Sequence, residues 1–186
     1  VEFTRAVETE YNNETTSRTV RVVADLESNQ KRTETIESSY GNNTTTVTNE
    51  THTRVYDADE NTVRTIQYES QGVSMLPQLT QLANESAVEY EYAGTDTVNG
   101  EEVYVLDATP TRTYGDQNVS MTVAVDTETY FAVQVSTDVR SDQYNVSTTQ
   151  AYSNVSINEN VPDSTFELDV PADATEQSYE GPEITS

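Results

Sequence analysis

The one histidine is the first candidate for acid–base chemistry in this sequence. His52 lies in the stretch THTRVY, where it alternates with Arg54 and Tyr56 in a pattern typical of a strand with a solvated face. A Ser–His–Asp arrangement would also need a nucleophile on a strained turn, and the sequence has no Gly-x-Ser-x-Gly elbow. We therefore interpret His52 as an exposed strand residue.

Carboxylates are abundant, and some stand close enough in sequence to be considered as acid–base pairs. Asp57 with Asp59, and Glu101 with Glu102, are examples. Such a pair works only when one partner is desolvated and its pKa is raised. Both pairs fall in predicted turns, where water keeps them ionised. The sequence thus predicts no catalytic residue, and we expect the protein not to be an enzyme.

Asp57, Asp59 and Asn61 follow the first half of a calcium-binding loop. The match ends there, because Thr62 stands where the loop needs Gly and Tyr68 where it needs a bidentate Glu. A hairpin turn with Asx hydrogen bonds accounts for the same residues. With no cysteine and no Gly-rich phosphate loop, we predict neither a metal site nor a cofactor.

Charge is the dominant feature of the composition. The 186 residues include 33 Asp and Glu but only 9 Lys and Arg, for a formal net charge of −24. This charge makes nucleic acid and anionic membrane surfaces poor partners. It suits a halophilic source, because the Debye length falls to about 3 Å in molar salt and surface carboxylates then cease to repel. An ordinary acidic secreted domain is the alternative.

Asparagine sequons indicate the compartment. The sequence has eight Asn-x-Ser/Thr sites, which favour an extracellular, cell-surface glycoprotein. The glycosylation candidates are Asn13, Asn42, Asn43, Asn49, Asn84, Asn118, Asn145 and Asn154.

Most of the chain alternates with the period of a β-strand. Residues 90–110, YEYAGTDTVNGEEVYVLDATP, are the clearest case: two alternating runs meet at Asn99-Gly100, a hairpin turn signal. Apolar residues on both faces of 103–106 predict a central strand there. In all we expect about 10–11 strands in a single curved antiparallel sheet, which at that size curls into an open half-barrel. Residues 1–174 form one mainly β domain, and 175–186 a tail or linker.

The spacing of the apolar residues changes once from that of a strand to that of a helix, in SMLPQLTQLANES. Met75, Leu76, Leu79 and Leu82 make an amphipathic helical stripe, so we predict one short helix that covers a face of the sheet.

The order of these features resembles the LolA/LolB-like lipoprotein-carrier superfamily, in the form found as surface lipoproteins of halophilic archaea. The motifs that carry the resemblance are a Val-Asn strand ending in Tyr-x-Leu at 98–106, an Asp-x-x-Thr turn at 126–132 and a closing Phe-to-Ala segment at 166–174. Ala132 departs from the family, which usually has Pro there. The helix that normally precedes the first strand is also missing, so we expect it to be absent or to lie upstream of residue 1.

The resemblance implies a non-enzymatic carrier whose concave face holds a lipid or other apolar ligand. The implied lid residues are Met75, Leu76, Leu79 and Leu82. The candidate cavity walls are Tyr90, Tyr92, Val103, Val123, Val125, Phe131 and Val133. The same residues are also the only plausible core, so simple packing is the competing interpretation.

Two functions therefore stay open. One is a lipid-binding carrier domain at the cell surface, associated with the membrane only through a missing N-terminal lipid anchor, since no apolar run approaches 18 residues. The other is a glycosylated structural or sensor-like ectodomain, akin to RseB-type sensors, that binds a protein partner and holds no ligand.

Overall fold

The computed structural model describes residues 1–67, 88–111, 117–157 and 160–180. They form twelve strands and one short 3-10 helix, η1 (Asp163–Phe166). The strands are β1 (Glu2–Tyr11), β2 (Glu14–Asp25), β3 (Gln30–Ser38), β4 (Thr44–Thr48), β5 (His52–Asp57), β6 (Thr62–Gln67), β7 (Val88–Val98), β8 (Glu101–Pro110), β9 (Asn118–Asp126), β10 (Ala132–Arg140), β11 (Asn145–Ser156) and β12 (Thr175–Glu180).

All twelve strands belong to one open sheet, in the order β12-β6-β5-β4-β3-β2-β1-β11-β10-β9-β8-β7. The pairs from β2 to β6 and from β7 to β11 are antiparallel. The predicted fold class, a single open antiparallel sheet, is confirmed. The strand beyond the predicted ten or eleven is β12, which lies in the segment predicted as a tail and runs parallel to β6.

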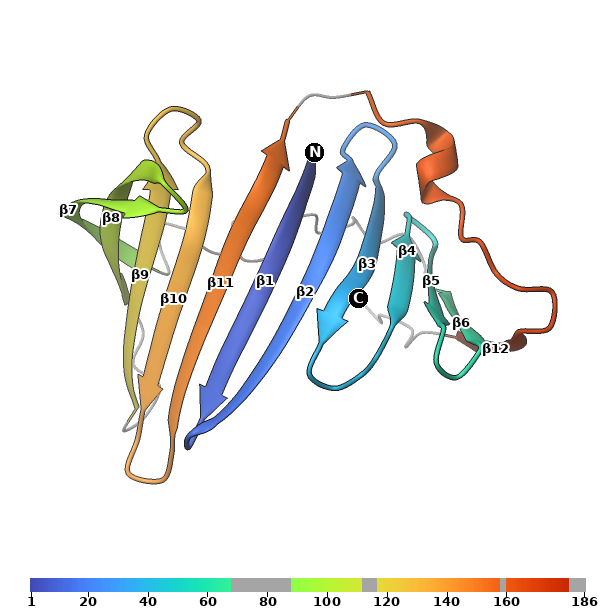
Figure 1. Ribbon diagram of the computed structural model, residues 1–186, viewed down its shortest axis with the longest axis horizontal. Helices are drawn as coiled ribbons and strands as arrows, with labels where there is room; N and C mark the ends of the chain where they lie inside the picture. The colour runs from blue at the N-terminus through green and yellow to red at the C-terminus, as the bar shows by residue number, and fades with distance from the viewer. Residues whose placement is uncertain (68–87, 112–116, 158–159, 181–186) are drawn as a thin grey trace. The chain divides into compact units, whose positions relative to one another are not determined.

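The chain divides into two compact units. Unit 1 comprises Val1–Thr4, Arg18–Met75 and Asn154–Ser186, and unit 2 comprises Arg5–Ser17 and Leu76–Ser153. Strands β2 to β6 and β12 lie wholly or mainly in unit 1, and β7 to β11 wholly or mainly in unit 2 (Figure 1).

The core of unit 1 lies beneath the chain that follows β11. Phe166 of η1 packs with Val23 and Val47 in a buried cluster, flanked by the partly buried Val161 and Leu168. The placement of Val23 and Val47 follows from register, because both stand opposite Arg32 of β3 and so share its face of the sheet.

Arg32 fixes the same segment by hydrogen bonds. Its Nη1 donates to the carbonyls of Glu167, at 2.7 Å, and of Thr165, at 3.3 Å. Its Nη2 lies 2.6 Å from Oε1 of Glu34. The side chain is only 19% exposed, so the two carbonyls near the end of η1 are satisfied by a charge that is largely shielded from water.

Unit 2 contains the predicted hairpin. Strands β7 and β8 pair from Val98 with Glu101 to Val88 with Pro110. The turn residues Asn99 and Gly100 have φ of 53° and 92°, the left-handed values that a two-residue hairpin turn requires. The Asn-Gly signal thus identified both strands, whose pairing register shifts once, between Tyr92 and Gly94.

The Asp126 turn has an equally local cause. The Asp126 carboxylate accepts hydrogen bonds from the Thr129 hydroxyl at 2.6 Å and the Thr129 amide at 2.7 Å. These bonds, the side-chain bond first, hold the pKa of Asp126 below its usual value. The Asp-x-x-Thr motif is therefore a self-contained turn between β9 and β10.

One expectation about the sheet was wrong. The strand over residues 103–106 was predicted to be central, but β8 is second from the end of the strand order and β7 is the end strand. The physical reason is that β1, from the start of the chain, pairs beside β11, so the N-terminal hairpin takes the middle of the order. Alternation along one strand gives no information about such a long-range pairing.

Candidate apolar binding face

Strands β7 to β11 bring apolar side chains into register across unit 2. Directly opposite residues in an antiparallel sheet share a face, so the register defines three rows of side chains. Row one is Tyr90, Ala108, Met121, Thr137 and Thr148; row two is Tyr92, Leu106, Val123, Val135 and Gln150; row three is Thr95, Tyr104, Val125 and Ala132. We call these three rows the apolar face.

The other side of the same strands is polar except around Val103, Val105 and Ala124. Glu91 of β7 stands opposite Asp107 of β8, which stands opposite Thr122 of β9. On β10, Asp138 lies between Ser120 and Ser147. The strands of unit 2 thus separate apolar from charged side chains, as alternation in the sequence predicts.

Exposure varies along the rows. Val123, Val135 and Ala108 are buried, whereas Tyr90 and Tyr92 on β7 are 37% and 60% exposed. Tyr92 also lies edge-on to Tyr104, with ring centroids 6.2 Å apart. Partial burial raises the pKa of the Tyr90 phenol. The accessible part of the apolar face is therefore its tyrosine margin along the end strand.

A second aromatic pair lies where β10 meets β11. The rings of Phe131 and Tyr152 are 6.0 Å apart and nearly perpendicular, a favourable edge-to-face arrangement. Tyr152 lies two residues beyond Gln150 of row two, so it projects from the apolar face, and it is buried. Burial raises the pKa of the Tyr152 phenol, and the charge of Arg5 lowers it by a smaller amount.

The residues predicted to form the cavity walls do not all lie in one place in the structure. Tyr90, Tyr92, Val123 and Val125 lie in the three rows, and Phe131 contacts Tyr152. Val133 falls at the irregularity between Ala132 and Gln134, where the β9–β10 register shifts. The predicted lid residues Met75, Leu76, Leu79 and Leu82 lie outside the described residues.

Val103 lies on the opposite side of β8 from the apolar face. It stands opposite Asp96 and Asp126, yet it is fully buried. The amide of Thr127 donates to the carbonyl of Glu102 at 3.3 Å, so the β9–β10 turn lies beside this end of β8. The apolar residues on both sides of 103–106 thus belong to a strand that is second from the end of the strand order.

Sequence reasoning missed several members of the apolar face. Leu106 and Val135 alternate correctly with their neighbours and could have been included from period alone. Tyr152 could not, because its strand is rich in Thr and Ser and shows little contrast between faces. No sequence pattern indicated that the charge of Arg5 lowers the pKa of Tyr152, since that effect depends on β1 lying beside β11.

Of the candidate acid–base and metal residues, Asp59 lies in the β5–β6 turn and Asp57 ends β5, whereas Glu101 and Glu102, predicted to lie in a turn, instead begin strand β8. The Asp57 carboxylate accepts from the amides of Asp59 and Glu60, and Oδ2 of Asp59 accepts from the Asn43 amide. The predicted hairpin turn at this position is confirmed. His52 is a strand residue as predicted, at the start of β5, but it is half-buried and not exposed, with its Nδ1 3.1 Å from the Thr51 hydroxyl.

The sequons differ in accessibility. Asn49 is half-buried, and its Oδ1 accepts from the amides of Thr51 and His52. Asn84 lies outside the described residues. The exposed sequon asparagines are Asn13, Asn42, Asn43, Asn118, Asn145 and Asn154.

Each unit also has a surface pocket lined largely by polar groups. The pocket of unit 2, about 450 Å³, lies at the ends of β1 and β10 and is lined by Glu10, Asp138 and Arg140 among others. The pocket of unit 1, about 380 Å³, is lined by Asp25, Glu27 and neighbouring residues. The lining of the unit 1 pocket also includes Val1, Ala24, Leu26 and Val161. In the described part of the chain no helix is both long and apolar enough to span a bilayer.

No protein-family model and no curated protein sequence matches the chain. Several solved structures, however, align with the chain. An uncharacterized conserved protein from Thermus thermophilus aligns with a TM-score of 0.54 at 13% identity, over 95% of this chain and 90% of that one. MucB aligns with a TM-score of 0.52 at 13% identity, over 94% of this chain and 58% of MucB.

Two further solved structures align with the chain. The Pseudomonas aeruginosa MucA/MucB complex aligns with a TM-score of 0.50 at 12% identity, over 90% of this chain and 56% of that one. A LolA superfamily protein from Nitrosomonas europaea aligns at 0.40 and 11% identity, over 90% of this chain and 89% of that one, too weakly to support an argument. At these identities the likeness shows the fold alone.

Proposed function

We propose that this chain is a non-enzymatic cell-surface domain that binds a lipid or another apolar ligand. The observation that carries the proposal is the apolar face of unit 2, whose rows run across four or five strands to an exposed tyrosine margin. Burying an acyl chain against such a face stabilises it by about 0.8 kcal/mol per methylene. The sequence motifs shared with lipoprotein carriers support the same ligand class.

The setting proposed for this activity is the exterior of a halophilic archaeal cell. The net charge of −24 and the exposed sequons support a salt-adapted, glycosylated surface. Attachment to the membrane would come from a lipid anchor outside the sequence given. Mass spectrometry of protein purified from its host tests the glycosylation and the lipid anchor, since glycans and an attached lipid each add a defined mass.

Tyr92 allows a binding test that leaves the buried rows intact. It is 60% exposed, so an acyl chain that covers about 50 Å² of its ring would gain about 1.3 kcal/mol, or roughly eightfold in affinity. We expect Tyr92→Ser to weaken binding of an anthroyloxy-labelled stearic acid methyl ester by about that factor in 2 M KCl. Glu91→Ser, one residue away on the polar face, is the matched control and should leave affinity unchanged.

Two results would reject this function. One is the absence of copurifying lipid in native mass spectra of host-derived protein together with no binding of the labelled ester in molar salt. The other is equal weakening by Tyr92→Ser and Glu91→Ser, which would mean that the tyrosine margin does not contact the ligand.

A protein partner is the second candidate, favoured by the position of β7. It is the end strand of the sheet order and carries the exposed Tyr92, and aromatic residues of this kind are enriched at protein interfaces. The structural likeness to MucB, solved in complex with MucA, is in keeping with such a role. Cross-linking of a host surface protein that Tyr92→Ser abolishes, with no lipid in the purified protein, would select this function over the first.

A further inference from the structure

Two identical Asn-Val-Ser sequons lie on either side of strand β10 in unit 2. One begins β9 at Asn118, and the other begins β11 at Asn145. Both asparagines stand directly opposite Arg140 of β10, and the serines that complete both sequons stand opposite Asp138. Because directly opposite residues share a face, the asparagine and serine of each sequon project from the polar face. We call Asn118 and Asn145 the sequon pair.

The side chains of the sequon pair are open to modification. Asn118 and Asn145 are both exposed, and neither side-chain amide makes a hydrogen bond to another described residue. Asn49 is the contrast within this chain. It is half-buried, and its Oδ1 accepts from the amides of Thr51 and His52, which holds its side chain against the β4–β5 turn. The fold thus presents the sequon pair and shields Asn49.

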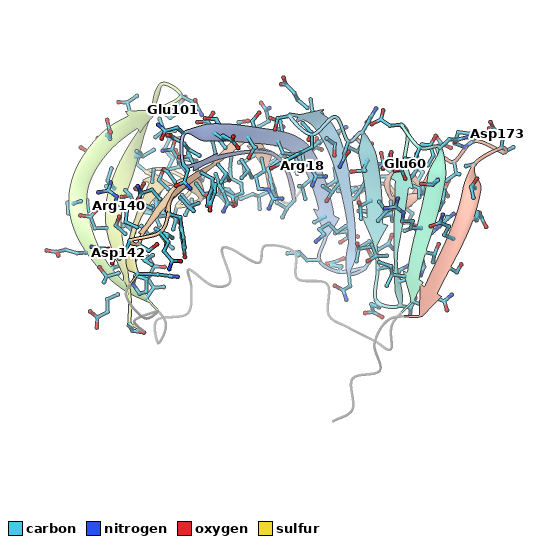
Figure 2. All side chains as sticks on the ribbon, turned by 90° about the horizontal axis from the view of Figure 1, so that it is seen from below. Arg18, Glu60, Glu101, Arg140, Asp142 and Asp173 are labelled. Atoms are coloured by element: carbon cyan, nitrogen blue, oxygen red, sulfur yellow. The ribbon has the colours of Figure 1, made fainter. Side chains whose placement is uncertain are left out.

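A polar pocket of about 450 Å³ lies beside Asn145. Its lining includes Asn145, Asp138 and Arg140, with Glu10 of β1. Arg140 lies at the same end of the unit as the Asp142 turn (Figure 2). Carboxylates, amides and a guanidinium supply both hydrogen-bond acceptors and donors, and sugar hydroxyls use both. The volume falls in the range of about 300–1,000 Å³ that is usual for small-ligand sites, and the lining suits a carbohydrate.

We propose that the sequon pair is N-glycosylated and that the first sugars of the Asn145 glycan lie in this pocket, against Arg140 and Asp138. The donor is an oligosaccharide linked to a lipid phosphate, used by a membrane transferase. Nδ2 of the asparagine attacks C1 of the first sugar. The bond from C1 to the phosphate oxygen breaks, a C1–N bond forms, and the lipid phosphate leaves as Nδ2 gives up one proton.

The sequon pair assigns the two sides of these strands to different molecules. Successive side chains point to opposite faces, so glycans on the polar face leave the rows of the apolar face uncovered. The inference rests on the proposed function only for the cell-surface location, where the transferase and its donor meet the chain. Lipid binding is not needed for it.

Glycopeptide mass spectrometry of the full chain purified from its host measures occupancy site by site. We expect a glycan mass on the peptides that contain Asn118 and Asn145, and an unmodified Asn49. Ser120→Ala and Ser147→Ala keep the asparagines but destroy the sequons, so each should remove one glycan mass. An unmodified Asn118 or Asn145 overturns the inference. So does an Asn49 as fully occupied as the pair, since the fold would then not select the sites.

A stability cycle tests the contact with Arg140. Ser147→Ala removes the Asn145 glycan and should lower the urea midpoint of unfolding in 2 M KCl. In an Arg140→Gln background the same change should lower it by less, because the sugar has already lost its partner. Thr15→Ala is the matched control: it removes the neighbouring sequon at Asn13, which also lines the pocket, and should have the same effect in both backgrounds.

Protein made in a bacterium without N-glycosylation and refolded in 2 M KCl isolates the contribution of the sugar. There Ser147→Ala should shift the midpoint equally with and without Arg140. Should Ser147→Ala lose its β circular dichroism, Asn145→Gln takes its place. Equal shifts in both backgrounds of the glycosylated protein would overturn the contact with Arg140.

The outcomes keep this inference distinct from the proposed function. Glycans on the sequon pair in a protein that binds no labelled ester support the inference and reject the lipid ligand. Ester binding by a protein whose sequon pair is unmodified does the reverse.

Discussion

The polar face of unit 2 contains a repulsive pair whose cost depends on salt. Asp107 of β8 stands directly opposite Glu91 of β7, and both carboxylates are exposed. Glu89, opposite Thr109, lies diagonally from Asp107 and adds to the repulsion. Like charges that face each other across an antiparallel pair destabilise the sheet. We therefore predict that Asp107→Asn stabilises the protein in dilute salt.

The size of the effect follows from the register. Directly opposite carboxylates about 6 Å apart repel by about 0.7 kcal/mol in water without screening. With a Debye length of about 10 Å at 0.1 M salt the repulsion falls to about 0.4 kcal/mol, and with about 3 Å at 1 M it falls to about 0.1 kcal/mol. Asp107→Asn should thus raise the free energy of unfolding by about 0.4 kcal/mol at 0.1 M KCl and by almost nothing at 1 M.

Urea unfolding at several KCl concentrations, followed by circular dichroism, measures this difference. Asp138→Asn is the matched control, because Asp138 lies on the same face with serines opposite on both neighbouring strands. It removes the same charge without relieving a direct repulsion, so we expect no stabilisation at any salt concentration. A gain for Asp107→Asn that is equal at 0.1 M and 1 M KCl, or that Asp138→Asn reproduces, would show that the predicted pair repulsion is not its cause.

Three further predictions test other contacts. Arg32→Met should lower the free energy of unfolding by about 2–3 kcal/mol, because two carbonyls lose a charged donor. In the same urea experiment Arg64→Met, which breaks an exposed ion pair, should lower it by less than about 1 kcal/mol. Because the folded state resists losing the Tyr152 phenol proton, stability should be constant below about pH 10 and should fall above it. In thermal unfolding scans, Tyr152→Phe should flatten this alkaline decline. Thr129→Ala should raise the pKa of Asp126 toward its usual value in an NMR titration, and an unchanged pKa would contradict the assigned hydrogen bonds.

Local patterns were enough to predict most strands and the side that each presents. The Asn99-Gly100 turn fixed the β7–β8 hairpin, and the alternation of Val123 and Val125 fixed the face of β9. These features depend only on neighbouring residues, through side-chain period and turn conformation. The apolar face is the sum of such alternations, which is why four of its members could be listed from sequence.

Long-range pairing was beyond the same reasoning. The parallel partner of β12 is β6, more than 100 residues earlier, and TEQSYE carries no apolar alternation that would mark it as a strand. Arg5 and Tyr152 likewise come together only because β1 inserts beside β11. Backbone pairing of this kind is driven by hydrogen bonds that every residue type can make, so composition does not reveal it.

A single sheet also explains how a chain with only 33% hydrophobic residues and a net charge of −24 can fold. A strand that buries one face needs an apolar side chain only at every second position, and small Val, Ala and Thr suffice there. Apolar surface is therefore scarce, and the inner residues Val123 and Val135 would serve both as core and as contacts for a ligand. Substituting them would lower stability and affinity together. The exposed margin at Tyr92 is where the proposed binding can be tested without emptying the core, and measurements there separate a carrier from a domain that is merely well packed.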